Sequence, residues 1–151
     1  MKEQDEDYMR LALAQAEAAA LRGEVPIGAV LVSAAGEVLA QDGNRIVAEH
    51  DPTAHAEMLV LRSGAARLGN ERLIGTTLYV SLEPCAMCAG AMSLARVARL
   101  VYAAADPKGG AIEHGPRFFA QATCHHRPVV ERAGDSDAAG RLLRDFFQAR
   151  R

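Results

Sequence analysis

Two short motifs in the sequence carry residue types that bind metal ions: H-A-E at residues 55–57 and P-C-A-M-C at residues 84–88. Cys85 and Cys88 are spaced i and i+3 at the expected start of a helix, so both thiols can reach one ion. The positive end of that helix dipole favours their thiolate form, which is the form that binds metal. His55, at the start of a neighbouring helix, can supply a third ligand. Three nitrogen and sulfur ligands leave one tetrahedral position for water, which is the pattern of a catalytic zinc site.

Glu57 lies two residues after His55. In a helix this spacing turns the side chain away from the ligand, so we do not expect Glu57 to bind the same ion. A carboxylate beside the open position of the metal can instead take a proton from water and pass it to a ring nitrogen and to a leaving amine. We therefore expect Glu57 to be the catalytic acid and base of the site.

Two other interpretations of the cysteine pair remain open. A redox pair would need a thioredoxin-like context, whereas this pair follows Glu83-Pro84 without an aromatic Trp-Cys-Gly lead. A closed structural site could add Cys124 and either His125 or His126 to the pair, because that tripeptide has a metal-like composition. Such a site would leave the H-A-E motif without a role.

Length and composition predict one globular domain spanning residues 1–151. Half of the 151 residues are hydrophobic and 24% are charged, which is ordinary for such a domain. The acidic start at residues 1–7 has no signal-peptide pattern, and no apolar run is long enough to span a bilayer. Two of the three cysteines lie too close together for a disulfide framework. These features predict a cytoplasmic protein with no membrane partner.

The formal net charge of −2 gives no support to a broad nucleic-acid-binding surface. Any contact with RNA would have to use a local cluster, such as Arg141, Arg144, Arg150 and Arg151 near the end of the chain. The alternative for this cluster is a solvated helix face whose basic end suits the helix dipole.

Hydrophobic periodicity and turn residues predict strands that alternate with helices. The helix-like segments are residues 5–21, 51–68, 84–95 and a closing amphipathic helix that includes 139–146; the strand-like segments are 27–32, 38–42, 76–82, 100–104 and 128–131. Asp51-Pro52-Thr53 is a helix-start signal, and Gly69-Asn70 is a stop. Residues 106–122 are expected to form a loop with short helical pieces, and loops of this length are often functional. Together these elements indicate an α/β layered domain.

In these two motifs and the sequence around them, the chain resembles the zinc-dependent cytidine deaminase superfamily, and most closely its bacterial tRNA-specific adenosine deaminases. The motif H-x-E followed by P-C-x-x-C is the known signature of zinc deaminases. The resemblance extends through continuous stretches and covers nearly the whole chain. The matching stretches are residues 23–30, 51–57, 78–92 and 145–147.

The resemblance implies a three-layer α/β/α cytidine deaminase-like fold around a five-stranded mixed sheet. It implies hydrolytic conversion of adenosine to inosine at the wobble position of a tRNA anticodon, with one Zn²⁺ per subunit of a homodimer. Asn44 matches a position that hydrogen-bonds the flipped base, and Phe147 matches a residue near the pocket wall. Asp106 and Lys108 match a loop near the RNA. The sequence pattern also allows other roles: Asn44 as a turn residue, Phe147 as a core residue of a helix face, and Asp106 as a cap of the next helical turn.

We expect no catalytic role for several other polar residues. Glu83 is interpreted as a structural hydrogen-bonding group, and His50 and His114 as ordinary surface or core residues. Cys124 matches no ligand position of the superfamily, and the segment 112–123 differs from its best-known members. Two further functions remain possible: a deaminase of a free nucleobase or nucleoside such as guanine or cytosine, and a zinc-stabilised binding module that has lost catalysis. The presence of Glu57 argues against the last.

Overall fold

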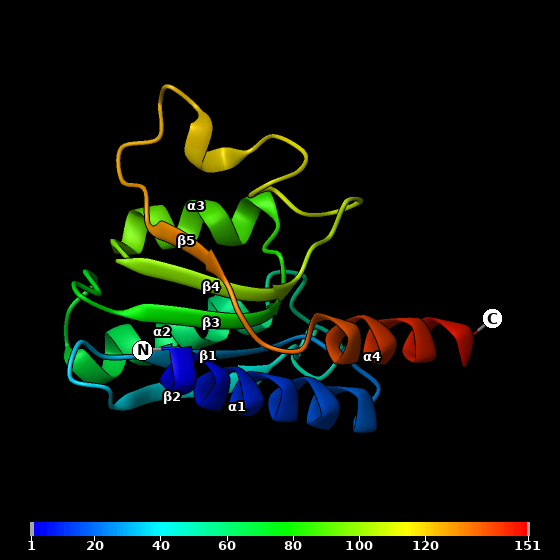
Figure 1. The fold of residues 1–151 in the computed structure, drawn as a ribbon. Coiled ribbons are helices and arrows are strands. Elements are labelled where there is room, and N and C mark those ends of the chain that lie inside the picture. The colour runs from blue at the N-terminus through cyan, green and yellow to red at the C-terminus, as the bar shows by residue number, and fades with distance from the viewer. Residues whose placement is uncertain (1, 151) are drawn as a thin grey trace.

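The computed structural model describes residues 2–150, so Arg151 of the basic cluster lies outside the described residues. Helices and strands alternate along the chain (Figure 1). In chain order the elements are α1 (Lys2–Leu21), β1 (Gly28–Val32), β2 (Val38–Gly43), α2 (Ala56–Leu68), β3 (Thr77–Leu82), α3 (Ala86–Ala95), β4 (Arg99–Ala104), the short 3₁₀ helix η1 (Phe118–Ala120), β5 (Val129–Arg132) and α4 (Ser136–Gln148).

The five strands form one mixed sheet in the order β2-β1-β3-β4-β5. β1 pairs antiparallel with β2 and with β3, whereas β3, β4 and β5 run parallel to one another. A parallel pair requires a crossover, which α3 provides between β3 and β4. The carboxyl ends of β3 and β4 therefore lie at the same edge of the sheet. The segment that carries Cys85 and the loop after residue 104 both leave the sheet at this edge.

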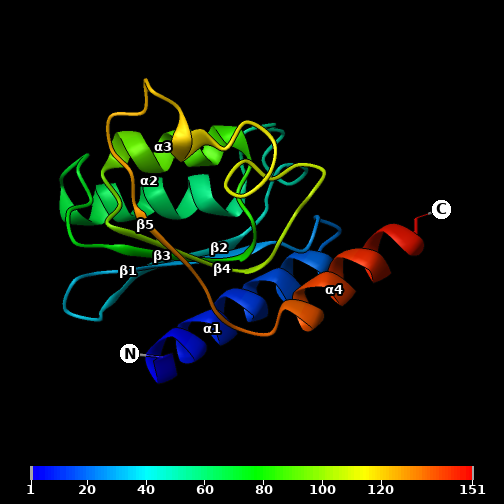
Figure 2. The same ribbon diagram turned by 45° about the horizontal axis from the view of Figure 1, so that its top comes forward.

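Helices cover both faces of the sheet, so the expected three-layer α/β/α fold is confirmed. Figure 2 shows α2 and α3 on one face and α1 and α4 on the other. The first face buries a cluster of apolar side chains that includes Val60, Met92 and Tyr102, and the second buries a smaller cluster that includes Met9 and Ala139. Because β1 and β3 are covered on both sides, their central residues are buried almost without exception.

Gly28 allows α1 to pack unusually close to the sheet. A Cβ atom at this position would lie 1.9 Å from the carbonyl oxygen of Ala12 and 2.5 Å from the backbone nitrogen of Ala16. Only a residue without a side chain leaves room for the helix backbone at this distance. The Ala-rich stripe of α1 has the same consequence, because its small side chains at Ala12 and Ala16 are fully buried against the strands.

The predicted elements agree with the observed ones, with the largest differences at three helix starts. α1 begins at Lys2, three residues before the predicted start. The Asp51-Pro52-Thr53 signal does not begin a helix: the Asp51 carboxylate accepts hydrogen bonds from the backbone N–H and hydroxyl of Thr53, which closes a separate turn. α2 begins only at Ala56, and α3 begins at Ala86 and not at Pro84. These last two shifts place an expected ligand, His55 or Cys85, at the helix N-cap.

Among residues 2–150, no helix combines the length and the apolar character that crossing a membrane requires. α1 has 20 residues, but it carries acidic side chains in its first turn and further charges along its length. Its buried stripe is used within the fold, against the strands and α4.

Candidate active site

The expected metal residues lie at the front ends of α2 and α3. His55 is the N-cap of α2 and Cys85 is the N-cap of α3, and both have extended backbone conformations. Neither N-cap side chain is used to cap its own helix, so both side chains are available for another role. Cys88 lies one turn into α3 and is fully buried. Two helix N-termini thus converge on one point, where their dipoles favour negative charge.

The structure brings His55, Cys85 and Cys88 together in an arrangement that fits zinc. His55 Nδ1 lies 3.7 Å from Cys85 Sγ and 3.6 Å from Cys88 Sγ. All three donor atoms lie within 4.8 Å of one another. A tetrahedral zinc ion with ordinary bond lengths would place nitrogen and sulfur ligands about 3.6 Å apart. The spacing and the donor types therefore fit a zinc ion with three protein ligands.

The two thiols of this cluster differ in their tendency to ionise, because the hydrogen bond with Cys85 and burial raise the pKa of Cys88 whereas the pKa of Cys85 is lowered. A hydrogen bond with the Cys88 thiol lowers the pKa of Cys85 to about 4, and a hydrogen bond with His55 contributes in the same direction against the effect of burial. The hydrogen bond with Cys85 raises the pKa of His55 above its usual value. One thiolate thus forms readily even without a cation. A divalent ion would favour the thiolate of both cysteines and the neutral imidazole.

Glu57 lies beside the cluster in the second position of α2 and is only 3% exposed. Burial raises the pKa of this carboxyl group to about 7, and interactions with Cys85, His55 and Cys88 also affect it, so the group is close to all three. Its Oε1 atom is buried and has no hydrogen-bond partner within residues 2–150. A buried carboxylate oxygen without a partner is costly in a purely structural role. An unpartnered carboxylate oxygen is instead expected of a group that accepts and donates protons during a reaction.

Asn44 is buried and holds the start of α2. Its Oδ1 atom accepts a hydrogen bond of 2.8 Å from the backbone N–H of Ala56. This contact supplies the cap that the His55 side chain does not provide, and it leaves His55 free to point at the cysteines. Within the described part of the chain, the amide nitrogen of Asn44 has no acceptor. The residue is therefore more than the turn residue that its sequence context also allowed.

Glu24 also shapes this region, although its sequence context predicts no specific role for it. Its carboxylate is 2% exposed and accepts hydrogen bonds from the backbone N–H groups of Val47 and Ala48, at 3.1 and 2.8 Å. These bonds hold the turn between Asn44 and the start of α2. The sequence shows only a glutamate in a loop shortly before a buried strand. That position does not reveal hydrogen-bond partners more than twenty residues away in the chain.

Glu83 is a structural hydrogen-bonding group, as the sequence predicts. Its side chain is fully buried, and it accepts hydrogen bonds from the backbone N–H groups of Asp106, Ile112, Glu113 and His114. Burial alone would raise the pKa of Glu83, but these donors and the His114 ring hold the pKa below its usual value.

Phe147 lies apart from the metal cluster, on the exposed side of α4. Its ring is 49% exposed and packs edge-on against Phe146, with the ring centroids 5.4 Å apart. It lines an apolar groove of about 600 Å³ that neither Glu57 nor any of the three cluster residues lines. The other walls come from the segment before β1, the end of β3, the loop after β4 and α4, and include Ile27, Leu82, Pro107, Lys108 and Leu143. Phe147 is thus a groove residue and not the core residue that its helix pattern also allowed.

Cys124 and the histidines beside it do not reach the cysteine pair. Cys124 is buried, with its sulfur 3.7 Å from Ser93 Oγ and 3.2 Å from the carbonyl oxygen of His126. The His126 ring lies 2.6 Å from the carbonyl oxygen of Val97. Among residues 2–150, the only cluster able to hold a metal ion joins the cysteine pair to His55. The interpretation of the cysteine pair as part of a closed structural site with Cys124 is therefore wrong.

Comparison with known proteins supports a zinc site at His55, Cys85 and Cys88. A family model described as the cytidine and deoxycytidylate deaminase zinc-binding region matches residues 2–104. A tRNA-specific adenosine deaminase from Agrobacterium fabrum is 54% identical over 144 residues, which cover 95% of this chain and 94% of that protein. The chain belongs to the tRNA-specific adenosine deaminase family. As a member of this family it is a zinc-dependent deaminase, and the histidine and two cysteines of its one candidate cluster fit that metal.

Two solved structures place this family member among related enzymes. One comes from a study of A-to-I editing by tRNA:A34 deaminases at the wobble position; it has a TM-score of 0.82 at 57% identity and covers 84% of this chain and 97% of that chain. The other is a guanine deaminase from Nitrosomonas europaea, with a TM-score of 0.75 at 26% identity, covering 93% of this chain and 83% of that chain. The fold is therefore shared by enzymes that act on a base in RNA and by enzymes that act on a purine base.

Proposed function

We propose that this protein is a zinc-dependent hydrolase that converts adenosine to inosine at the wobble position of a tRNA anticodon. The observation that carries the proposal is the buried Glu57 carboxylate, with one unpartnered oxygen, beside a three-ligand cluster. The high identity to a tRNA-specific adenosine deaminase over nearly the full length of both chains supports the substrate.

In this proposal His55, Cys85 and Cys88 would hold the zinc ion, which would supply Lewis acidity and lower the pKa of water toward neutral pH. Glu57 accepts the proton of the attacking water, because its carboxylate is buried next to these residues and its Oε1 atom has no hydrogen-bond partner within residues 2–150. A carbon–oxygen bond forms at C6 of adenine, and Glu57 passes the proton to N1. Glu57 then takes the proton of the new C6 hydroxyl group and gives it to the amine, so that ammonia leaves as the C6–N bond breaks and the C6 oxygen becomes a carbonyl.

Asn44 and Phe147 are the proposed substrate contacts. The amide nitrogen of Asn44 has no acceptor within the described residues, so it can donate a hydrogen bond to the base while Oδ1 caps α2. The exposed ring of Phe147 offers an apolar wall in the groove along α4. The wobble base must leave the stack of the anticodon loop to reach Glu57, which costs little in a loop that is already single-stranded.

The proposal is tested by offering the zinc-loaded protein four substrates: a tRNA anticodon stem-loop with adenosine at the wobble position, free adenosine, guanine and cytosine. Products are separated by liquid chromatography after nuclease digestion of the RNA. We expect inosine from the stem-loop and no product from the free compounds. Deamination of a free compound with the stem-loop unchanged would contradict the proposal.

Guanine deamination is the second candidate function. The observation in its favour is the similarity in fold to a guanine deaminase, together with a net charge of −2 that gives no help in binding RNA. The much higher identity to the tRNA-specific enzymes favours the RNA substrate. The guanine reaction in the experiment above separates the two directly.

We further propose that the protein acts in the cytoplasm as a homodimer that binds one zinc ion per subunit. The tRNA substrate and the reduced cysteines that zinc requires support the location. The family resemblance of the sequence, which implies a homodimer, supports the assembly. Sedimentation equilibrium of the zinc-loaded protein tests it: a mass twice that of the chain is expected, and a monomer at micromolar concentration would contradict it.

A further inference from the structure

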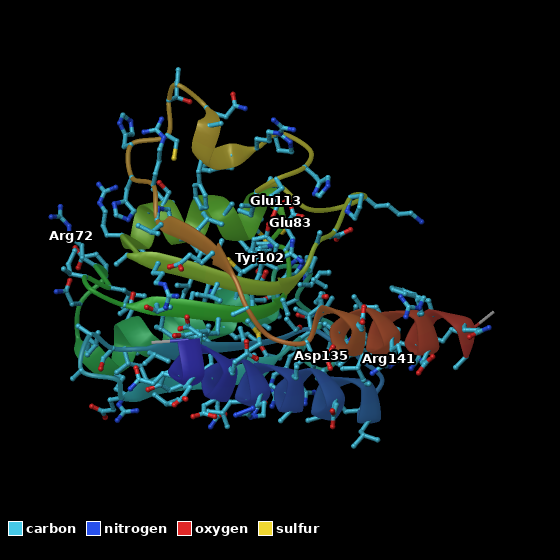
Figure 3. All side chains as sticks on the ribbon, viewed as in Figure 1. Arg72, Glu83, Tyr102, Glu113, Asp135 and Arg141 are labelled. Atoms are coloured by element: carbon cyan, nitrogen blue, oxygen red, sulfur yellow. The ribbon has the colours of Figure 1, made fainter. Side chains whose placement is uncertain are left out.

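Glu83 lies in the connection between β3 and α3, and five nitrogen atoms lie within hydrogen-bond distance of its carboxylate. Oε1 lies 2.9 Å from the backbone nitrogen of Asp106 and 2.8 Å from His114 Nδ1. Oε2 lies 3.1, 3.0 and 3.2 Å from the backbone nitrogens of Ile112, Glu113 and His114. Three successive N–H groups around one carboxylate oxygen form an anion-binding nest. In Figure 3 the Glu83 side chain lies with Glu113 and Tyr102 at the base of the loop that follows β4.

These bonds hold both ends of the segment 106–114, which has no regular secondary structure. The same segment makes a further bond to the metal motif, because the N–H of Ala111 donates to the carbonyl oxygen of Pro84 at 2.8 Å. Gly110 fits under the carboxyl group: a Cβ atom there would lie 2.4 Å from Glu83 Cδ and 2.5 Å from Oε2. The loop is thus built around this one carboxylate.

Glu83 also lies between the two parts of the site. It precedes Cys85 by two residues, and its own N–H donates to the carbonyl oxygen of Ala104 at 2.8 Å, which extends the pairing of β3 with β4. The loop that it holds provides Pro107 and Lys108 to the groove that Phe147 lines. A shift of this loop would move one wall of the groove and leave the ligands of the metal in place.

We infer that Glu83 is a positioning residue that fixes the loop 106–114 against the metal motif and thereby sets the wall of the groove that receives the RNA. The inference rests on the proposed function for the identity of the substrate. Glu83 touches neither the reacting base nor the metal. Its carboxylate acts through the loop, so its loss weakens substrate binding more than it slows the chemical step.

The test compares Glu83→Gln with two other variants in the zinc-loaded full chain. Gln keeps one oxygen for the three N–H groups of residues 112–114, but without the negative charge these bonds become weaker, and its amide NH₂ opposes the donor of Asp106. Gly110→Ala disturbs the same contact from the side of the loop, because the new methyl group collides with the carboxyl group. Glu113→Gln is the matched control: its side chain contacts Tyr102 and Arg132 and not Glu83.

Two measurements are made on each variant, together with its zinc content. Hydrogen exchange reports the loop without any substrate, and we expect the amides of residues 112–114 to exchange about tenfold faster in Glu83→Gln and Gly110→Ala. Steady-state kinetics with the anticodon stem-loop should show KM raised about tenfold, with kcat changed less than about threefold. Glu113→Gln should match the wild type in both, and all three variants should retain zinc.

The outcomes separate this inference from the proposed function. If wild-type protein leaves the stem-loop unchanged, the proposed function fails, while faster exchange in the variants still supports the hold on the loop. Unchanged exchange in both Glu83→Gln and Gly110→Ala would overturn the inference. So would faster exchange with KM and kcat unaltered. If Glu83→Gln loses zinc, Gly110→Ala decides: a loss of zinc and kcat there too means that Glu83 supports the metal site and not the substrate loop.

Discussion

Replacement of Glu57 by Gln should separate metal binding from proton transfer. We expect the variant to keep its fold and its zinc, since Glu57 is not proposed as a ligand, and to lose turnover by about 10³-fold because the proton acceptor is gone. Zinc content by atomic absorption and inosine formation by chromatography are the two measurements. A variant that loses its metal would show that Glu57 is a ligand, and the assignment of its role would be wrong.

The three proposed ligands and the proposed role of Glu57 could be predicted from local sequence. His55, Cys85 and Cys88 are recognisable by residue type and spacing, because ligands at two helix starts need only a short pattern in each. The hydrogen-bond partners of Asn44, Glu24 and Glu83 could not be predicted in this way, since each side chain binds backbone N–H groups twelve to 31 residues away, and no local pattern records such a partner.

Cys88 and Cys124 should differ in their effect on the zinc content of the protein. Cys88→Ala should reduce the zinc content of purified protein severely, because it removes one of three protein ligands. Cys124→Ala is the matched control, since Cys124 is also buried but contacts Ser93 and a backbone carbonyl. It should retain one zinc ion per chain. Loss of zinc from the Cys124 variant would restore the closed structural site that the geometry argues against.

At the scale of elements, the strands and helices were predictable because their apolar periodicity is strong, whereas three helix starts were not. Asp51-Pro52-Thr53 has the composition of an N-cap, but the Asp51 side chain closes its own turn and α2 begins three residues after Thr53. The actual cap comes from Asn44, twelve residues before Ala56. A distant cap leaves no signal in the sequence next to the helix.

The close contact between α1 and β1 can be tested at Gly28. Gly28→Ala should destabilise the protein by about 3 kcal/mol, because the added methyl group would overlap the backbone of α1 and force the helix away from the sheet. Urea unfolding measures the change. Gly140→Ala in α4 is the control: its methyl group would meet only the flexible end of Arg144, and better helix propensity should stabilise the protein by about 0.5 kcal/mol. Equal stability of Gly28→Ala and wild type would contradict the packing argument.

The N-terminal part of α1 is held to the sheet by Asp5, whose carboxylate binds Arg99 at 2.6 and 2.8 Å and accepts from the Tyr79 hydroxyl at 2.6 Å. The hydrogen bonds from Arg99 lower the pKa of Asp5, with a smaller contribution from Tyr79 and opposed by burial. A carboxyl group whose pKa is lower in the folded state stabilises the fold above its unfolded pKa. That stability is lost as the pH falls below about 4.

Asp5→Asn should therefore have a pH-dependent effect on stability. We expect the variant to be less stable than wild type by about 2 kcal/mol at pH 7, and the difference to shrink as the pH falls below about 4. Unfolding by urea at a series of pH values measures it. Asp7→Asn on the same helix is the control, since Asp7 pairs with Arg10 in an exposed position and should contribute little. A difference that stays constant between pH 7 and pH 3 would contradict the account.

At the scale of the whole molecule, the sequence and the structure explain the chemistry more directly than they explain the substrate. The zinc centre and Glu57 follow from a few side chains. In the proposed function, recognition of an RNA loop depends on a surface assembled from the segment before β1, the end of β3, the loop after β4 and α4. A chain with a net charge of −2 offers little general attraction to RNA. Substrate choice therefore has to come from the shape of the groove, the loop held by Glu83 and the proposed second subunit.

The most direct test of the central claim is a single reaction in ¹⁸O-labelled water. The zinc-loaded protein is incubated with an anticodon stem-loop that carries adenosines at the wobble position and elsewhere in the loop, and the RNA is sequenced by mass spectrometry. We predict one inosine, at the wobble position, with the label on its base oxygen and one ammonia released per inosine. Unlabelled inosine, inosine at every adenosine of the loop, or an unchanged RNA would contradict the account.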